Sequence, residues 1–153
     1  MENFKQTNLD DNLLKAISEM GFETPTSVQA KTIPHLLNSN VDLIATAQTG
    51  TGKTAAFGLP SIHLTDLKSR YTSTLVLCPT RELCIQIAKD LTKYSKYING
   101  LNILAVYGGI DVRGQIKALN KGVHIVIGTP GRTKDLIKRN KLKIGSIARI
   151  ILD

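Results

Sequence analysis

Continuous apolar runs alternate with amphipathic stretches along most of the chain. Strands are predicted at five such runs, VDLIAT (41–46), TLVLCPT (74–80), LNILAVYGG (101–109), VHIVIGTP (123–130) and IARIILD (147–153). Apolar runs without polar alternation are typical of strands buried on both faces of a parallel sheet. Between them, apolar residues recur at spacings of three and four and predict helices. The pattern therefore predicts an α/β fold with a mainly parallel sheet of five or more strands, flanked by helices.

Two further helices are predicted before the first strand. Residues 10–21 have one apolar face, and Asp10 or Asp11 can cap the first turn through a side-chain oxygen. Residues 25–39 form the second helix, which Pro34 is expected to disturb because proline lacks the backbone N–H. Ligands of open parallel sheets bind beyond the carboxyl ends of the strands, so the loops after the strands are expected to gather at one edge.

The composition indicates a soluble, cytoplasmic protein without membrane contact. A length of 153 residues suits one domain, with 42% hydrophobic and 21% charged residues. No apolar run approaches the ~20 residues of a membrane helix, and the first residues contain no apolar signal core. Cys78 and Cys84 lack a CxxC spacing and are predicted to be buried, reduced thiols. His35, His63 and His124 fit no metal or catalytic spacing and are predicted to be packing or surface residues.

Charge is distributed unevenly along the chain. The net charge is +8, but residues 1–66 carry a net charge of −3 and residues 67–153 a net charge of +11. Such asymmetry indicates an anionic partner for the second part. A solvated basic face that binds nothing explains the charge equally well at this point.

The stretch AQTGTGKT, residues 47–54, follows the first predicted strand and predicts a phosphate-binding loop. Gly50 and Gly52 allow the backbone N–H groups to turn inward toward phosphate oxygens. The positive N-terminal end of the next helix adds to this attraction. Lys53 can reach the β- and γ-phosphates, and the Thr54 hydroxyl can bind Mg²⁺.

The upstream stretch GFETPTSVQ contains candidates for recognising a base. The Gln29 amide can both donate to and accept from one edge of adenine. Phe22, or the isolated Phe4, can stack on the ring. A solvated glutamine and a core phenylalanine are the alternative interpretations of these residues.

The ordered set GFETPTSVQ, AQTGTGKT, PTREL, GG, TPGR and ILD resembles the N-terminal RecA-like domain of the DEAD-box RNA helicases. The resemblance extends from Phe4 to Asp153. It implies that residues 1–153 form one RecA-like phosphate-loop domain, the ATP-binding half of an ATP-dependent helicase that locally unwinds RNA duplexes. A second RecA-like domain, which brings arginine fingers, would lie elsewhere in the parent protein.

The resemblance also assigns site residues. ATP-binding residues would be Phe4, Phe22, Gln29, Ala47, Gln48, Thr49, Gly50, Thr51, Gly52, Lys53 and Thr54. Residues for sequence-independent contacts to the RNA backbone would be Pro79, Thr80, Arg81, Gly108, Gly109, Thr129, Pro130, Gly131 and Arg132. Lys53, Thr54 and Asp153 would carry catalysis, with Thr54 and Asp153 holding Mg²⁺, the latter through a water molecule.

Simpler roles remain open for the RNA motifs. Thr80 and Thr129 can cap the helices that follow them, Pro130 suits a first helical position, and the glycine pair can form a turn. Asp153 matches the first acid of the D-E-A-D motif, and the glutamate expected next is not in the chain. We therefore expect weak binding of adenine nucleotide and negligible hydrolysis by this chain, with the parent protein as the ATPase. A DNA helicase or other nucleotide hydrolase, and an ATP-gated RNA clamp, are the alternative functions.

Overall fold

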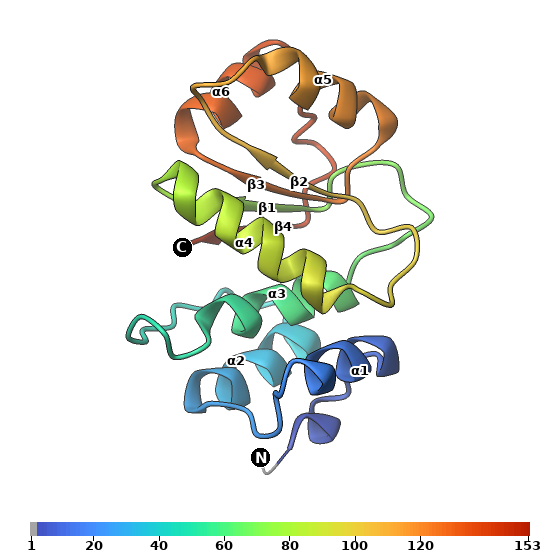
Figure 1. Cartoon of the computed structure of the whole chain (residues 1–153), viewed down its shortest axis with the longest axis vertical. Helices are drawn as coiled ribbons and strands as arrows, with labels where there is room; N and C mark the ends of the chain where they lie inside the picture. Colours follow the sequence, from blue (N-terminus) through green and yellow to red (C-terminus); the bar gives the residue numbers. More distant parts are fainter. Residues whose placement is uncertain (1–2) are drawn as a thin grey trace. The chain divides into compact units, whose positions relative to one another are not determined.

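The chain folds into two compact units in the computed structural model, which describes residues 3–153. The first unit comprises the residues up to Leu64 together with Asp90–Asn99. The second comprises Thr65–Lys89 and Gly100–Asp153. Figure 1 shows the course of the chain through the elements.

The first unit is built from helices. They are η1 (Phe4–Thr7), α1 (Asp11–Glu19), α2 (Ser27–Asn38), α3 (Lys53–His63) and the last turn of α4 (Arg81–Tyr94). The predicted cap of α1 is confirmed, because the Asp10 side chain accepts a hydrogen bond from the Asn12 N–H. The largest fully buried side chains of this unit are Leu13, Ile17, Ile33, Leu59 and Leu91. No helix within residues 3–153 has the length and hydropathy needed to cross a membrane.

Two helices of this unit continue through a proline. Pro34 lies inside α2, and Pro60 lies inside α3. Each proline removes one backbone donor from the helix. The Asn38 side-chain amide donates to the Pro34 carbonyl oxygen at 2.8 Å, which adds a bond in the last turn of α2. Pro34 therefore costs α2 a hydrogen bond but does not end it.

Residues 41–46 do not form the predicted strand. The segment has no regular structure, and Val41, Leu43 and Ile44 are exposed. A strand exists only through hydrogen bonds to a neighbouring strand, and none of the four strands in the described chain pairs with this segment. The prediction of five or more strands is therefore wrong for residues 3–153. Apolar composition indicates that a segment can be buried, but it does not supply a pairing partner.

The second unit contains a parallel sheet, as predicted. Its strands are β1 (Thr74–Leu77), β2 (Ile103–Val106), β3 (Ile125–Gly128) and β4 (Arg149–Leu152). Their order across the sheet is β2-β3-β1-β4, and every neighbouring pair is parallel. Four of the five strands predicted from apolar runs are thus confirmed.

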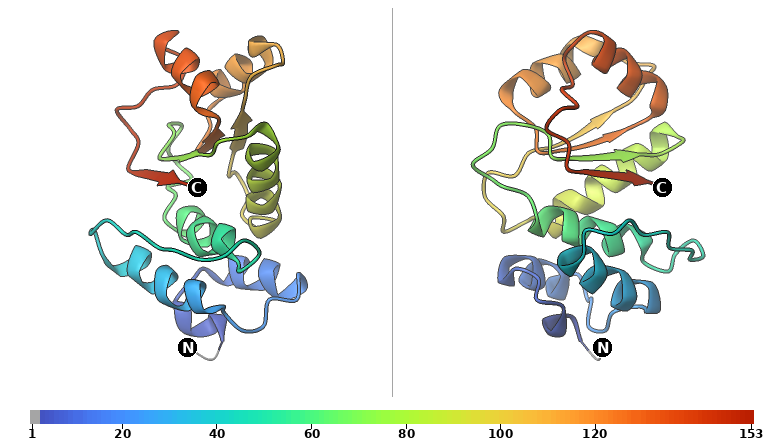
Figure 2. Two further views of the ribbon diagram at one scale, coloured as in Figure 1. Left: turned by 90° about the vertical axis from the view of Figure 1, so that its left-hand side faces the viewer. Right: turned by 180° about the vertical axis from the view of Figure 1, so that it is seen from behind.

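Helices cover both faces of this sheet. The connection from β1 through α4 to β2 crosses the sheet in one direction, whereas those through α5 (Val112–Lys121) and α6 (Pro130–Lys138) cross in the other. Because such crossovers are right-handed, opposite directions place the helices on opposite faces. In Figures 1 and 2, α5 and α6 accordingly lie together on one side of the strands, and α4 lies on the other.

Each face has its own apolar packing. Leu75, Val106 and Val126 from the strands pack with Leu136 and Leu142 on the side of α5 and α6. On the side of α4, Val76, Ile125 and Ile127 are fully buried. The central strand β3 is buried throughout, which confirms the prediction made from its unbroken apolar run. The edge strand β4 instead alternates between partly buried and exposed residues.

Candidate functional site

The glycine-rich loop leads into the N-terminus of α3 in the first unit. Gly52 is the N-cap residue with φ 88°, and Gly50 has φ 80°. Glycine adopts these left-handed angles without the strain that other residues incur. Thr51 closes the loop by donating its hydroxyl hydrogen to the Gln48 carbonyl oxygen at 2.6 Å. The first N–H groups of a helix have no intrahelical partners, so this loop and helix can bind an anion.

Two polar side chains at the start of α3 are available for a ligand. Lys53 and Thr54 are partly buried, and neither side chain has a hydrogen bond or ion pair within the described part of the chain. An ammonium group held beside unpaired backbone N–H groups attracts phosphate oxygens, and a hydroxyl can bind a hard cation. The donor set thus fits a nucleotide phosphate with Mg²⁺. Of the other loop residues, Gln48 and Thr49 are exposed and Ala47 is partly buried.

Gln29 connects the start of α2 to the glycine-rich loop. Its Nε2 donates to the Gly52 carbonyl oxygen at 3.1 Å, and its Oε1 accepts from the Thr26 N–H at 2.9 Å. The Thr26 hydroxyl accepts from the Gln29 N–H in return, which completes a capping box. Gln29 is only 3% exposed, so the interpretation as a solvated glutamine is wrong. Its amide retains one further donor hydrogen and one acceptor lone pair, the two groups needed for an adenine edge.

The candidate stacking residues belong to an aromatic cluster. The ring centroids of Phe4 and Phe22 lie 6.2 Å apart, and Phe22 meets Tyr94 edge-on at 6.0 Å. Phe4 is buried, so it packs on Phe22 instead of standing isolated. The cluster places Phe22, four residues before the capping box begins at Thr26, in a defined position. Desolvation by burial raises the pKa of the Tyr94 hydroxyl to about 12.

The carboxyl ends of the four strands lie side by side at one edge of the sheet in the second unit. Residues Leu77, Gly128 and Leu152 share one level of the register, and Val106 pairs with Gly128. The pairing of β1 with β4 extends one residue beyond β4, because the Asp153 N–H donates to the Leu77 carbonyl oxygen at 3.0 Å. The predicted gathering of loops is confirmed for these strands. The loops contain Pro79, Thr80, Gly108, Gly109 and Thr129, and β4 leads into Asp153. Arg81 begins α4, and the first turn of α6 contains Pro130, Gly131 and Arg132.

Arg81 lies beside the glycine pair. Its guanidinium carbon is 5.4 Å from the centroid of the Tyr107 ring, a cation–π contact. A Cβ atom added to Gly109 would come within 2.6 Å of Arg81 Nη1, and Gly109 has φ 82°. The glycine therefore provides both the backbone angle and the space for this arginine. Arg81 is exposed and can bind a phosphate group at the edge of the sheet.

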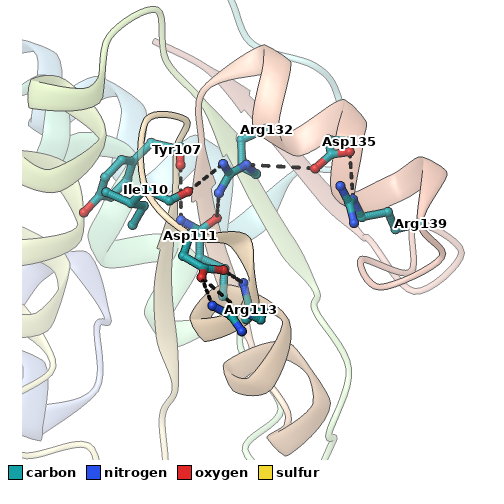
Figure 3. Close-up of polar contacts among 8 residues, drawn as sticks. Tyr107, Ile110, Asp111, Arg113, Arg132, Asp135 and Arg139 are labelled. Carbon is teal, nitrogen blue, oxygen red and sulfur yellow. Dashed lines mark hydrogen bonds and ion pairs between the residues drawn. The ribbon is translucent and has the colours of Figure 1, made fainter.

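Arg132 bonds to the residue that follows the glycine pair (Figure 3). Its Nη2 donates to the Ile110 carbonyl oxygen at 3.0 Å, and its Nη1 donates to Gln115 Oε1 at 3.1 Å. Asp135 Oδ2 lies 4.0 Å from its Nε. Only 12% of the Arg132 side chain is exposed. The two arginines predicted to contact RNA thus have different environments, one exposed and one engaged within the protein.

Gln115 contacts the predicted site residue Arg132 and was missed by the sequence analysis. It is 5% exposed, and its Nε2 donates to the Tyr107 carbonyl oxygen at 3.1 Å. One signal could have identified it. Gln115 lies at the apolar spacing of Val112, Ile116 and Leu119 on α5, and an amide on an apolar helix face needs buried partners.

The two threonines that precede helices behave differently. Thr80 caps α4, because its hydroxyl accepts from the Leu83 N–H at 3.2 Å. Thr129 is the N-cap residue of α6 and Pro130 takes the first helical position, but the Thr129 hydroxyl makes no capping bond. The capping interpretation is thus confirmed for Thr80. Thr129 occupies the N-cap position but does not cap the helix through its side chain.

The cysteines and histidines have structural surroundings. Cys78 and Cys84 are free and buried, as predicted. Desolvation by burial raises the pKa of Cys84 to about 12, and the neighbouring Cys78 contributes in the same direction. His63 Nδ1 accepts from the Asp10 N–H, and the buried His124 accepts from the Asn102 N–H through Nδ1. These contacts identify both histidines as packing residues.

The parallel sheet with helices on both faces, together with motif-bearing loops at its carboxyl edge, defines a RecA-like α/β domain. Residues 26–153 match the protein family described as DEAD/DEAH box helicase, and the chain belongs to that family. It is 49% identical over 153 residues to the ATP-dependent RNA helicase CshA of Listeria monocytogenes and 43% identical over 150 residues to the ATP-dependent RNA helicase DeaD of Escherichia coli.

Solved structures with the same fold support this relationship. A DEAD box protein from Methanococcus jannaschii aligns over the whole chain with a TM-score of 0.94 and 44% identity, and the match covers 41% of that protein. A variant of S. cerevisiae Dbp5 bound to RNA and ADP BeF3 aligns with a TM-score of 0.89 and 28% identity, covering 38% of its chain. The present chain spans 29% of the length of its Listeria relative and 24% of the E. coli protein.

Proposed function

We propose that this chain is the ATP-binding half of a cytoplasmic DEAD-box RNA helicase, which uses ATP binding and hydrolysis to separate local RNA duplexes. The observation that carries the proposal is the start of α3. There the Lys53 and Thr54 side chains have no hydrogen-bond or ion-pair partner among residues 3–153, and they follow two glycines with left-handed backbone angles. Relatives named ATP-dependent RNA helicases support the same activity.

In this proposal the first unit binds the nucleotide. Lys53 and the N–H groups at the start of α3 bind the phosphates. Gln29 presents its remaining donor and acceptor to adenine, and Phe22 packs on the base. Thr54 would bind Mg²⁺, which would neutralise charge on the phosphates. Because Gln29 also bonds to Gly52, base recognition and the loop conformation are directly connected.

The second unit binds RNA in this proposal. Thr80, Arg81 and the N–H groups of the glycine pair contact backbone phosphates, so recognition is independent of sequence. The charge of this unit supports the assignment, because it carries fourteen Lys and Arg residues against five Asp and Glu residues, a net charge of +9. A second RecA-like domain of the parent closes over ATP and RNA and contributes arginine fingers. An arginine finger can supply ~10³–10⁵-fold in rate, so this chain alone is expected to hydrolyse ATP negligibly.

The test compares binding of ADP and GDP to this chain and to its Gln29→Ala variant. ADP is expected to bind more tightly, and the substitution is expected to remove about 1–3 kcal/mol of that preference because a bidentate base contact is lost. Thr26→Ala is the matched control, since it removes the hydroxyl of the same capping box and leaves the Gln29 amide. Equal binding of ADP and GDP by the unsubstituted chain contradicts adenine recognition and leaves phosphate binding alone.

A parallel binding experiment tests the nucleic acid. Single-stranded RNA and DNA of the same sequence are compared, because the 2′-hydroxyl is the group that distinguishes them. Tighter binding of RNA supports the helicase proposal, whereas equal binding favours a protein that acts on DNA or on both.

A further inference from the structure

The glycine pair Gly108–Gly109 is held at both of its ends by one hydrogen-bonded chain. The preceding carbonyl, that of Tyr107, accepts from Gln115 Nε2 at 3.1 Å. The following carbonyl, that of Ile110, accepts from Arg132 Nη2 at 3.0 Å. Gln115 Oε1 and Arg132 Nη1 are joined to each other at 3.1 Å, so the two anchors form a continuous link.

The two side chains that form this link are largely buried, which distinguishes them from the exposed polar side chains nearby, and only the bond to the Ile110 carbonyl lies at the surface. Gln115 is 5% exposed, and the Arg132 side chain is 12% exposed. The nearby pair of Asp111 and Arg113, also drawn in Figure 3, has side chains that are 54% and 87% exposed. A buried hydrogen bond lacks competition from water and holds its partners more rigidly than an exposed one.

The Arg132 guanidinium is poorly accessible to an external anion, because only 12% of the side chain is exposed and each of its nitrogens faces a protein group. Two of its nitrogens donate to Gln115 and Ile110, and the third faces Asp135 at 4.0 Å. Arg81 is different, because it is exposed and makes a cation–π contact with Tyr107. The side chain best placed to meet a phosphate at this edge is therefore Arg81.

We propose that Arg132 and Gln115 are positioning residues, which hold the Gly108–Gly109 N–H groups in the orientation that receives an RNA phosphate, while Arg81 supplies the charge. The inference rests on the proposed RNA-binding function and assigns roles within that site. Gln115 thereby affects RNA affinity without touching RNA. The arrangement uses the glycine pair as a preorganised donor loop, and its rigidity comes from α5 and α6.

The test uses Gln115→Met, which keeps the approximate volume and the charge of the chain but removes both hydrogen-bonding groups. Affinity for a single-stranded oligouridylate is measured over a range of salt concentrations, and hydrogen exchange of the Gly108 and Gly109 amides is measured by NMR without RNA. We expect about tenfold weaker RNA binding, in line with the loss of a buried hydrogen-bond link, and faster amide exchange. The slope of log K against log salt is expected to stay unchanged, because no phosphate contact is lost.

Two arginine variants separate positioning from direct contact. Arg81→Gln is expected to reduce the salt slope by about 0.7, the value for one phosphate on a single strand. Arg132→Lys keeps the charge but loses the planar set of donors, so it is expected to weaken RNA binding as much as Gln115→Met does. The double variant is expected to be no weaker than either single one, because both substitutions break the same link.

Several results would overturn the inference. It is wrong if Arg132→Lys binds RNA as the unsubstituted chain does, or if Arg132→Gln lowers the salt slope as Arg81→Gln does. It is also wrong if Gln115→Met leaves the glycine amides unchanged. If Gln115→Met does not fold, Gln115→Glu keeps an acceptor for Arg132 and removes the donor to Tyr107, and the Gly108 amide is then expected to exchange faster. If the unsubstituted chain binds no RNA, the proposed RNA function fails for this chain, and the amide measurement alone decides whether the link positions the loop.

Discussion

Gln29 donates a hydrogen bond from its side-chain amide to the backbone carbonyl oxygen of Gly52, at 3.1 Å. The contact joins the first turn of α2 to the residue that caps α3, across 23 positions of sequence. Gly52 also lacks room for a side chain, because an added Cβ would collide with the same amide. A change in the glycine-rich loop is therefore expected to affect Gln29, the residue proposed to recognise the base, and a change at Gln29 is expected to affect the loop.

Alanine substitutions in the phosphate loop are expected to differ in severity. Gly50→Ala meets no atom within 4 Å and costs only the strain of φ 80°, which is about 1–2 kcal/mol. Gly52→Ala has the same strain and in addition displaces the Gln29 amide, so it is expected to destabilise the fold more and to weaken ADP binding further. Urea unfolding and ADP titration of both variants measure these effects. Equal losses in stability and affinity would show that the contact with Gln29 is unimportant.

Two helical glycines are expected to respond to alanine with opposite signs. In the first unit, a Cβ at Gly58 would lie 2.9 Å from Leu91 Cδ1, so Gly58→Ala overpacks the contact between α3 and α4. Overpacking costs about 1–3 kcal/mol and exceeds the ~1 kcal/mol gained from helix propensity. In the second unit, Gly114 on α5 has nothing within 4 Å, and Gly114→Ala is expected to stabilise by up to about 1 kcal/mol.

The measurement for this pair is the free energy of unfolding in urea. Leu91→Ala in the Gly58→Ala background serves as a control, because it removes the side chain that the new methyl group meets. The double variant is expected to be more stable than the sum of the single effects predicts. Additive losses would argue that Leu91 is not the obstacle.

Replacing Thr133 by valine is expected to leave stability unchanged or to raise it. The Thr133 hydroxyl is buried on α6 and has no hydrogen-bond partner among the described residues. A buried polar group without a partner costs about 1–3 kcal/mol, and valine has the same shape without the hydroxyl. Thr133→Ser is the matched control, since it keeps the hydroxyl and loses the methyl group. A marked loss of stability in Thr133→Val would mean that the hydroxyl does have a stabilising partner.

Alkaline pH is expected to destabilise the protein through Cys84. Burial raises the pKa of this thiol to about 12 in the folded chain, whereas an unfolded cysteine ionises near pH ~8.5. Between these two pH values the thiol loses its proton in the unfolded chain but keeps it in the folded chain, which favours unfolding. Stability from this group is therefore intact below pH ~8.5 and falls as the pH rises toward 12, by up to about 1.4 kcal/mol per unit.

The contribution of Cys84 is isolated by comparing the chain with Cys84→Ala between pH 7.5 and 10. The variant leaves a cavity and starts from lower stability, but its unfolding free energy is expected to decline less steeply with pH. Parallel curves for the two proteins would rule out a role for Cys84 in the alkaline loss.

Much of the fold could be predicted because its signals are local. Strands β1 to β4 each lie inside a predicted apolar run, and Asp10 and Thr80 cap the helices that they precede. The glycines, lysine and threonine of the phosphate loop follow one another directly, so their spacing alone indicates phosphate chemistry. The uneven charge and the order of the motifs could likewise be identified from the sequence without knowledge of contacts.

Contacts between distant residues had to come from the tertiary structure. The segment 41–46 has the apolar composition of a strand but no partner among the four strands, and pairing is not a property of one segment. Arg81 and Arg132 stand in similar motifs, yet one is exposed and the other bonds to Gln115 and Ile110. By itself the sequence determined which residues have the type and spacing suited to phosphate chemistry, because both are properties of neighbouring positions. Only the folded chain decided which of them remain free to use it, because burial and hydrogen bonding depend on neighbours far away in the sequence.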